Sequence, residues 1–205
     1  MNPTPSPNRR DLLLKVLPAC SLCLGCSRLG MAAALSQTPS AIPLSAKAAE
    51  KTDMTYEDLF KFAYVGMIPV MKNLAAQIGK DKFLEMLMKA SSEAAARGVE
   101  AEYRDKPKRD LATWMADLKK PGPLYEHTLT YEILKDTEKE AEFRITECLW
   151  AKTFRQADAA DIGYASICHG DIAAVLAFNP KLKMDRPKIL MKGEDECRYH
   201  LVMET

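Results

Sequence analysis

The chain has 205 residues, and its 29 basic and 28 acidic side chains give a formal net charge of +1 at pH 7. This balance, with no basic stripe interleaved with aromatic residues, argues against a nucleic-acid-binding surface. Beyond the N-terminal region, no apolar run in the sequence is long enough to span a bilayer. About 155 residues follow that region, which is sufficient for one domain with a hydrophobic core.

The N-terminal residues have the features of an export signal. Asn8–Leu13 contains a polar residue, a pair of arginines, one further residue and two leucines, and so resembles the twin-arginine pattern. The apolar run Val16–Gly25 is too short and too rich in small residues to remain as a membrane span. We therefore predict that residues 1–48 are a signal and tether, recognised by the twin-arginine machinery and directing the protein to the periplasm or cell envelope. The alternative is an ordinary basic, amphipathic helix.

Two routes of processing are open. Ala46–Ala48 is an A-x-A-like cleavage site, whereas Cys23–Cys26 resembles a lipobox, as does Leu17–Cys20. A lipid on Cys26 would anchor the domain through a flexible tether, and this is the only membrane contact that we expect.

The six cysteines fall into two groups. The first group lies inside the signal with C-x-x-C-x-x-C spacing, but it lacks the fourth cysteine and the proline of a ferredoxin run. We interpret its members as small apolar residues: Cys20, Cys23 and Cys26. The second group has an odd number of cysteines, which is unusual for a protein of an oxidising compartment. Either two of them form a disulfide and the third is a free thiol, or all three are chemically active thiols. Its members are Cys148, Cys168 and Cys197.

The first part of the domain predicts helices. A capping box headed by Thr55 starts a helix with apolar residues at helical spacing as far as residue 78, and Pro69 should kink it. Two more helices are expected over residues 81–98 and 107–119, the latter opened by a proline.

The sequence then changes to an alternation of apolar and polar residues with a period of two. Residues 129–133 and 141–145 predict a hairpin with one buried face. By parity, Cys148 falls on the other face with Arg144 and Thr146, unless the strand has already ended.

Two helices and a second hairpin complete the chain. The helices are expected over residues 149–156 and from Asp161 to Asn179, and the hairpin strands over 181–191 and 197–203, with Pro187 marking an edge or bulge. This order predicts a single α+β domain over residues 49–205, in which N-terminal helices pack on an antiparallel sheet with inserted helices.

The last sixty residues carry an ordered set of chemically active residues. Cys148 ends a strand, Cys168 and Asp171 form a C-x-x-D motif, an Asn-Pro turn and an arginine follow, and G-x-x-x-C with an aromatic closes the series. The pattern resembles the L-2-amino-thiazoline-4-carboxylic acid hydrolase family over roughly residues 55–203. The matching positions are Cys148, Cys168, Asp171, Asn179, Pro180, Arg186, Gly193 and Cys197.

This resemblance implies hydrolytic ring opening of a small cyclic amidine or isothiourea. Water adds to the ring carbon between sulfur and nitrogen, the C–S bond breaks, and the product from 2-amino-thiazoline-4-carboxylate is an N-carbamoyl cysteine. Such a site needs a nucleophile, a proton donor and a cation for the substrate carboxylate. Cys168 would attack as a thiolate only if its pKa were lowered, and Asp171 would act as a base or orient water.

The remaining candidates follow from the chemistry that such a reaction needs and from their place near Cys168 and Asp171. Cys148 is expected to join the catalytic pair, and Arg186 or Arg155 to hold the substrate carboxylate by paired hydrogen bonds. Asn179 and His169 are expected to contribute to substrate binding.

The same residues allow non-catalytic interpretations. Three cysteines with Asp171 or a histidine would suit a zinc or iron site, so we consider Cys148, Cys168 and Cys197 as alternative metal ligands. The closing Gly193-x-x-x-Cys197-x-Tyr199 also resembles the end of the vinyl-reductase-type small-molecule-binding domain, which favours a ligand-binding module of the cell envelope. A redox partner with a reversible disulfide, and plain core packing of each cysteine, are the further alternatives.

Overall fold

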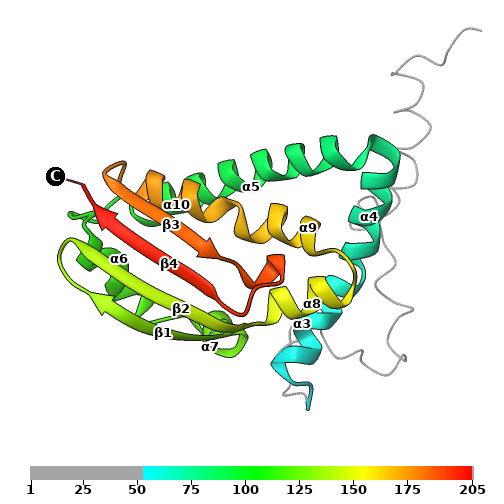
Figure 1. Cartoon of the computed structure of the whole chain (residues 1–205), viewed down its shortest axis with the longest axis horizontal. Helices are drawn as coiled ribbons and strands as arrows, with labels where there is room; N and C mark the ends of the chain where they lie inside the picture. The colour runs from blue at the N-terminus through cyan, green and yellow to red at the C-terminus, as the bar shows by residue number, and fades with distance from the viewer. Residues whose placement is uncertain (1–52, 205) are drawn as a thin grey trace, which may run out of the picture. The chain divides into compact units, whose positions relative to one another are not determined.

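The computed structural model describes residues 53–204, which form one compact unit (Figure 1). The predicted signal, its cleavage and lipidation sites and the first cysteine group lie outside the described residues. Between residues 53 and 204, no helix combines the length and the apolar character needed to cross a membrane.

The N-terminal helices are α3 (Tyr56–Val65), α4 (Met67–Ile78) and α5 (Lys80–Glu102). The predicted capping box is confirmed, because the Thr55 amide donates to Asp58 Oδ2 and the Asp58 amide donates to Thr55 Oγ1, both at 3.1 Å.

The break in the first predicted helix falls at Gly66 and not at Pro69. Pro69 is the third residue of α4, where a backbone amide would have no partner within the helix, so the ring fits without a kink. The predicted end of the second helix at Gly98 was also wrong, because α5 continues through Gly98 to Glu102.

Two short helices, α6 (Leu111–Leu118) and α7 (Pro123–Thr128), lead to the sheet. The predicted start of α6 at residue 107 was four residues early, because Asp110 is the N-cap and accepts a hydrogen bond from the Thr113 amide at 2.9 Å. Helix α6 ends before Pro121, and Pro123 opens α7.

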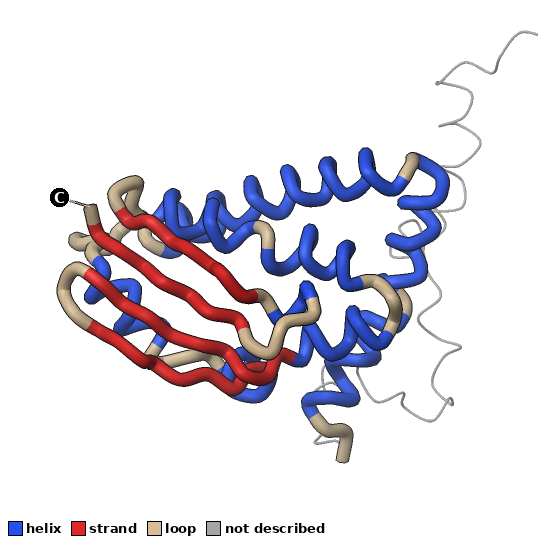
Figure 2. The backbone as a smooth tube through the Cα atoms, viewed as in Figure 1, coloured by secondary structure: helices blue, strands red, loops and turns tan. Residues whose placement is uncertain are grey.

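Four antiparallel strands form one sheet in the order β1-β2-β4-β3 (Figure 2). The strands are β1 (Leu129–Asp136), β2 (Glu140–Cys148), β3 (Leu182–Lys188) and β4 (Cys197–Met203). The two predicted hairpins supply these strands, and alternate residues of β2 are buried as the period of two indicated. The sheet and the helices confirm the predicted α+β class.

Two irregularities interrupt the ladders at one end of the sheet. Thr130 pairs with Glu147 while Tyr131 pairs with Ile145, so Thr146 is an extra residue in β2. On the edge strand β3, the register is likewise irregular between Asp185 and Lys188, where Pro187 lies. The predicted bulge at Pro187 is therefore confirmed, and each bulge changes which side chains face inward beyond it.

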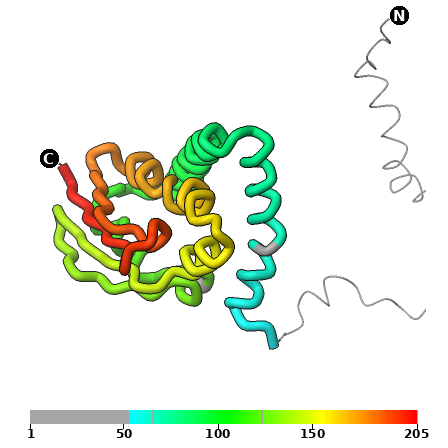
Figure 3. The backbone as a smooth tube through the Cα atoms, turned by 45° about the vertical axis from the view of Figure 1, so that its right-hand side comes forward, coloured from blue at the N-terminus to red at the C-terminus, as the bar shows by residue number. Residues whose placement is uncertain are grey.

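The connection between the hairpins supplies the inserted helices. These are α8 (Leu149–Gln156), α9 (Ala160–Gly163), the π-helix η1 (Tyr164–Cys168) and α10 (Gly170–Phe178), while a 3-10 turn η2 (Leu190–Lys192) lies between β3 and β4. Helix α10 packs against β3, and α5 lies along α10 (Figures 1 and 3). Figure 3 shows α8 and α9 between the sheet and α3–α4.

Candidate functional site

The bulge in β2 turns Cys148 toward the helices. Parity placed this residue on the outer face, but Thr146 adds one residue to the strand and reverses the alternation. Cys148 therefore packs against the core, and its Sγ, at the N-cap of α8, accepts a hydrogen bond from the Ala151 amide at 3.5 Å. The parity prediction was wrong because it assumed a regular strand.

Cys168 and Asp171 approach the same region from the inserted helices. The amide of His169 donates to the Tyr164 carbonyl five residues earlier at 2.9 Å, which is the bond that defines the π-helix η1. Cys168 is the last residue of η1, and Asp171 lies in the first turn of α10. Single π-turns of this kind occur frequently at functional sites.

Arg186 and Tyr199 bind the carboxylate of Asp171 from the sheet. Arg186 Nη1 donates to Asp171 Oδ2 at 2.7 Å, and the Tyr199 hydroxyl donates to the same oxygen at 3.1 Å. No hydrogen bond from residues 53–204 reaches the other oxygen, Oδ1. The carboxylate thus has one fixed oxygen and one that is free for water or a ligand.

Arg186 and Asp171 differ in how far their side chains are buried. The Arg186 side chain is 4% exposed, and its Nε is buried without a hydrogen-bond partner among the described residues. Asp171 is enclosed by protein but keeps 38% of its side-chain surface accessible. The arginine is consequently held inside the protein, while the carboxylate remains accessible to solvent.

Burial shifts the ionisation of every thiol in the cluster toward the neutral form. It raises the pKa of Cys197 to about 11, raises the pKa of Cys148, and raises the pKa of Cys168 far above its ordinary value. The charge of Asp171 adds to this effect on all three. Cys168 therefore lacks the lowered pKa that its predicted role as a thiolate nucleophile required.

Burial also raises the pKa of the Asp171 carboxyl, and Arg186 and the Tyr199 hydroxyl only partly offset it. The same burial raises the pKa of Tyr199 well above its usual range, so that its hydroxyl stays protonated and can only donate to the carboxylate.

The three thiols lie near enough to affect one another's pKa, yet all are free. Among residues 53–204, no three His, Cys, Asp or Glu side chains converge in a way that could hold a metal ion. Cys197 Sγ accepts from the Leu190 amide at 3.2 Å, and Cys148 Sγ is similarly engaged by Ala151. Among the described residues there is thus no preformed metal site, and the alternative assignment of Cys148, Cys168 and Cys197 as metal ligands stays a prediction.

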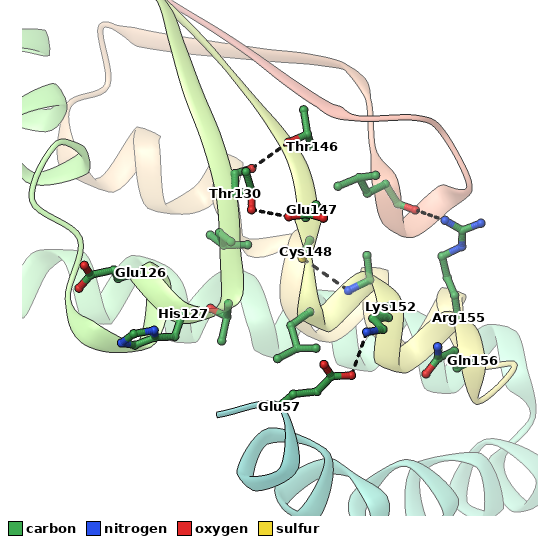
Figure 4. Close-up of a pocket in the computed structure, with 15 residues that line it drawn as sticks. Glu57, Glu126, His127, Thr130, Thr146, Glu147, Cys148, Lys152, Arg155 and Gln156 are labelled. Atoms are coloured by element: carbon green, nitrogen blue, oxygen red, sulfur yellow. Dashed lines mark hydrogen bonds and ion pairs between the residues drawn. The ribbon is translucent and has the colours of Figure 1, made fainter. Parts of the chain in front are cut away.

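A cavity of about 850 Å³ opens beside the cluster (Figure 4). Cys148 lines it and so connects the cavity with the thiol and carboxylate cluster. Lys152 and Arg155 of α8 line it as well, but Lys152 forms an ion pair with Glu57 at 2.8 Å. Arg155 donates to the Leu190 carbonyl at 3.4 Å, and no carboxylate of the described chain forms an ion pair with it.

Comparison with known proteins now decides the family. The family model described as L-2-amino-thiazoline-4-carboxylic acid hydrolase matches residues 59–201, which is more than half of the chain. The chain belongs to this hydrolase family. The resemblance seen in the sequence is thereby confirmed at the level of the family.

A sequence search of curated proteins finds no match. Among solved structures, the chain is similar to the phenol-responsive sensory domain of the transcription activator PoxR with phenol, at 14% identity and a TM-score of 0.45, covering 75% of this chain and 76% of that one. It is also similar to trafficking protein particle complex subunit 3 from Naegleria fowleri covalently bound to palmitic acid, at 12% identity and a TM-score of 0.42, covering 71% and 97%.

Two residues that were expected to contribute to substrate binding have other contacts. Asn179 follows α10, where its Nδ2 donates to the Arg109 carbonyl at 2.6 Å and its Oδ1 accepts from the Lys181 amide at 2.9 Å. The ring of His169 packs edge-on against Tyr164, with centroids 5.9 Å apart. The structure therefore gives Asn179 a role in closing the helix and places His169 beside η1.

One member of the cluster was not among the predicted site residues. Tyr199 was noted only as the aromatic that follows Cys197, yet it contacts Asp171 directly. Its position two residues after Cys197 on β4 was the available signal, because alternate strand residues face the same side.

Proposed function

We propose that this protein is an exported hydrolase that opens the ring of a small cyclic amidine or isothiourea carboxylate, such as 2-amino-thiazoline-4-carboxylate. Family membership supports the class of reaction. The observation that carries the proposal is the Asp171 carboxylate, whose Oδ2 is fixed by two donors, whose Oδ1 has no donor among the described residues, and whose side chain is 38% exposed.

Asp171 is the general base in this mechanism. It takes a proton from water through Oδ1 while the water oxygen bonds to the ring carbon between sulfur and nitrogen. The C–S bond then breaks, and the protonated carboxyl returns the proton to the departing sulfur, so that one water is added overall. The raised pKa of Asp171 favours both steps, because an effective acid–base group has a pKa close to the working pH.

The thiols act in this scheme as neutral groups. Cys168 and Cys148 stay protonated near neutral pH, so they form a polarisable wall beside the substrate sulfur instead of attacking its carbon. This assignment keeps both residues in the catalytic site but moves the nucleophilic role to water.

Arg155 holds the substrate carboxylate. Arg186 was the other candidate, but its Nη1 is committed to Asp171 and its side chain is almost fully buried. Arg155 lines the cavity beside Cys148, and it forms no ion pair with a carboxylate among the described residues. The cavity volume lies in the range of ordinary small-molecule sites.

The test is turnover of 2-amino-thiazoline-4-carboxylate, followed by the appearance of one new thiol per substrate. Asp171→Asn should lower kcat by about 100-fold or more, since general bases contribute 10²–10⁴-fold. Asp185→Asn is the matched control, because Asp185 is an exposed carboxylate on the same strand as Arg186. The proposal would be overturned if the wild type does not turn over this substrate, or if Asp171→Asn turns it over as fast as the wild type does.

A non-catalytic binding module is the second candidate. The neutral state of all three thiols favours it, since the cluster then contains no activated sulfur nucleophile. In that case 2-amino-thiazoline-4-carboxylate would bind by calorimetry and be recovered unchanged, and Arg155→Gln would weaken its binding.

Export by the twin-arginine route, with a lipid on Cys26, is part of the same proposal. The polar residue, arginine pair and leucines of Asn8–Leu13 support it. Replacing Arg9 and Arg10 by lysine should retain the full-length precursor in the cytoplasm. Cys26→Ser should release the mature domain from the membrane fraction if the lipobox is used, and should have no effect if cleavage follows Ala48.

A further inference from the structure

Tyr199 stands in the centre of the cluster without an assigned role. Its hydroxyl donates to Asp171 Oδ2, the oxygen that also accepts from Arg186. Among the described residues, these are the two hydrogen-bond donors to that carboxylate.

The sheet fixes the ring of Tyr199 on both sides. Phe143, its partner in the β2–β4 register, stacks on the ring with centroids 4.5 Å apart and planes inclined by 8°. The guanidinium of Arg186, from the opposite neighbour β3, lies 5.6 Å from the ring centroid. A ring held between two strands in this way places its hydroxyl at a defined point and limits its movement.

We propose that Tyr199 is a positioning residue for Asp171, which with Arg186 holds Oδ2 so that Oδ1 faces the attacking water. The inference rests on the proposed function, because it assigns Tyr199 to the base of that reaction. Tyr199 itself transfers no proton in this scheme. It supplies a hydroxyl that stays protonated because it is buried, and that donates to the carboxylate.

The effect of the Tyr199 hydroxyl on the pKa of Asp171 can be measured separately, because few other charged or titratable groups interact with this carboxyl. The charged or titratable groups that interact with Asp171 are Arg186, Tyr199, Cys148, Cys168 and Cys197. Helix α5, which packs against α10, presents uncharged groups at the contact with Gly170: Ser91 and Ala95.

Removing the Tyr199 hydroxyl alone takes away an interaction that lowers the pKa of Asp171. The pKa of the base then rises, and the acid limb of the kcat/KM profile, which reports the free base, moves to higher pH.

The test is Tyr199→Phe, which keeps the ring and its packing. We expect kcat to fall by about 10-fold with little change in KM, and the acid limb to move up on the order of one pH unit. Tyr131→Phe is the matched control: its hydroxyl donates to the Leu118 carbonyl at 2.8 Å, so this variant also loses one hydrogen bond on the same sheet. An acid limb that stays in place in Tyr199→Phe would overturn the inference.

A second measurement separates this inference from the proposed function. The Asp171 carboxyl can be titrated by 13C NMR in the full-length protein without substrate, in the wild type and in both tyrosine variants. A higher Asp171 pKa in Tyr199→Phe alone supports positioning by Tyr199 even if the wild type turns over no thiazoline. Identical titration curves in all three proteins would refute it even if turnover is found.

Discussion

Arg186 Nη1 lies 2.7 Å from Asp171 Oδ2, and this contact joins the edge strand β3 to the inserted helix α10. The two partners differ in access to water, because the Arg186 side chain is 4% exposed and that of Asp171 38%. Water therefore reaches the carboxylate but hardly reaches the guanidinium. The arginine depends on Asp171 for its neutralisation, whereas Asp171 can still exchange protons with solvent or a substrate.

Removing one partner of the Arg186–Asp171 pair should lower the free energy of unfolding more than removing one partner of a surface ion pair. Arg186→Met leaves the carboxylate without its cation, and we expect a loss of about 2 kcal/mol in the free energy of unfolding, reduced from the value for fully buried pairs because Asp171 is partly solvated. Arg97→Met is the control, since Arg97 pairs with the exposed Glu93 at 3.6 Å and its loss should lower the free energy of unfolding far less. Urea unfolding at pH 7 measures both, and equal losses would contradict the difference in burial.

The cysteines should react slowly in the folded protein. Burial raises the pKa of Cys197 to about 11 from an ordinary value of 9.0, which lowers its thiolate fraction at pH 8 roughly 100-fold. Alkylation by iodoacetamide, resolved by mass spectrometry of the peptides that carry Cys148, Cys168 and Cys197, should be correspondingly slow until urea is added. Equal rates in the native and unfolded protein would show that the thiols are accessible and ionised.

The same shift predicts a loss of stability in alkaline solution. Between pH 9 and 11 the unfolded chain releases the Cys197 proton while the folded chain retains it, so stability falls as pH rises through this window. The full effect of this one thiol is roughly 2–3 kcal/mol. Cys197→Ala should therefore show a shallower decline than the wild type in urea unfolding from pH 8 to 11. Parallel curves would mean that Cys197 ionises equally in both states.

Local patterns in the sequence were sufficient for much of the fold. The Thr55 capping box, both hairpins and helix α8 were predicted because each depends on residues within one or two turns or on one strand pair. Helix boundaries were less predictable. The break at Gly66 and the continuation of α5 through Gly98 were missed, because proline fits the first turn of a helix without a break and a glycine is tolerated inside one.

The site was predictable in its members but not in its chemistry. The motif indicated Cys148, Cys168, Asp171 and Arg186, and the structure brings them together. The sequence did not reveal the bulge at Thr146, because strand parity assumes that every residue is paired. Nor could it give the pKa of each thiol, which depends on burial by segments far apart in the chain.

The junction between α9 and η1 permits a last prediction that relates packing to the site. A Cβ at Gly163 would lie 2.7 Å from both Met191 Sδ and Phe154 Cγ, which is far inside van der Waals contact. Met191 is flexible, but the buried Phe154 ring cannot move freely, so Gly163→Ala should lower the free energy of unfolding by about 1–3 kcal/mol.

Gly98→Ala is the matched control for this substitution. Gly98 lies inside α5 with no atom within 4 Å of a Cβ, and alanine there should stabilise the protein by about 0.5–1 kcal/mol, because it is the better helix former. Opposite signs for the two variants in urea unfolding are the expected result. Since Gly163 directly precedes η1, which ends at Cys168, Gly163→Ala should also speed alkylation of Cys168. A stabilising effect at Gly163 would show that the contact between α9 and η2 is looser than described.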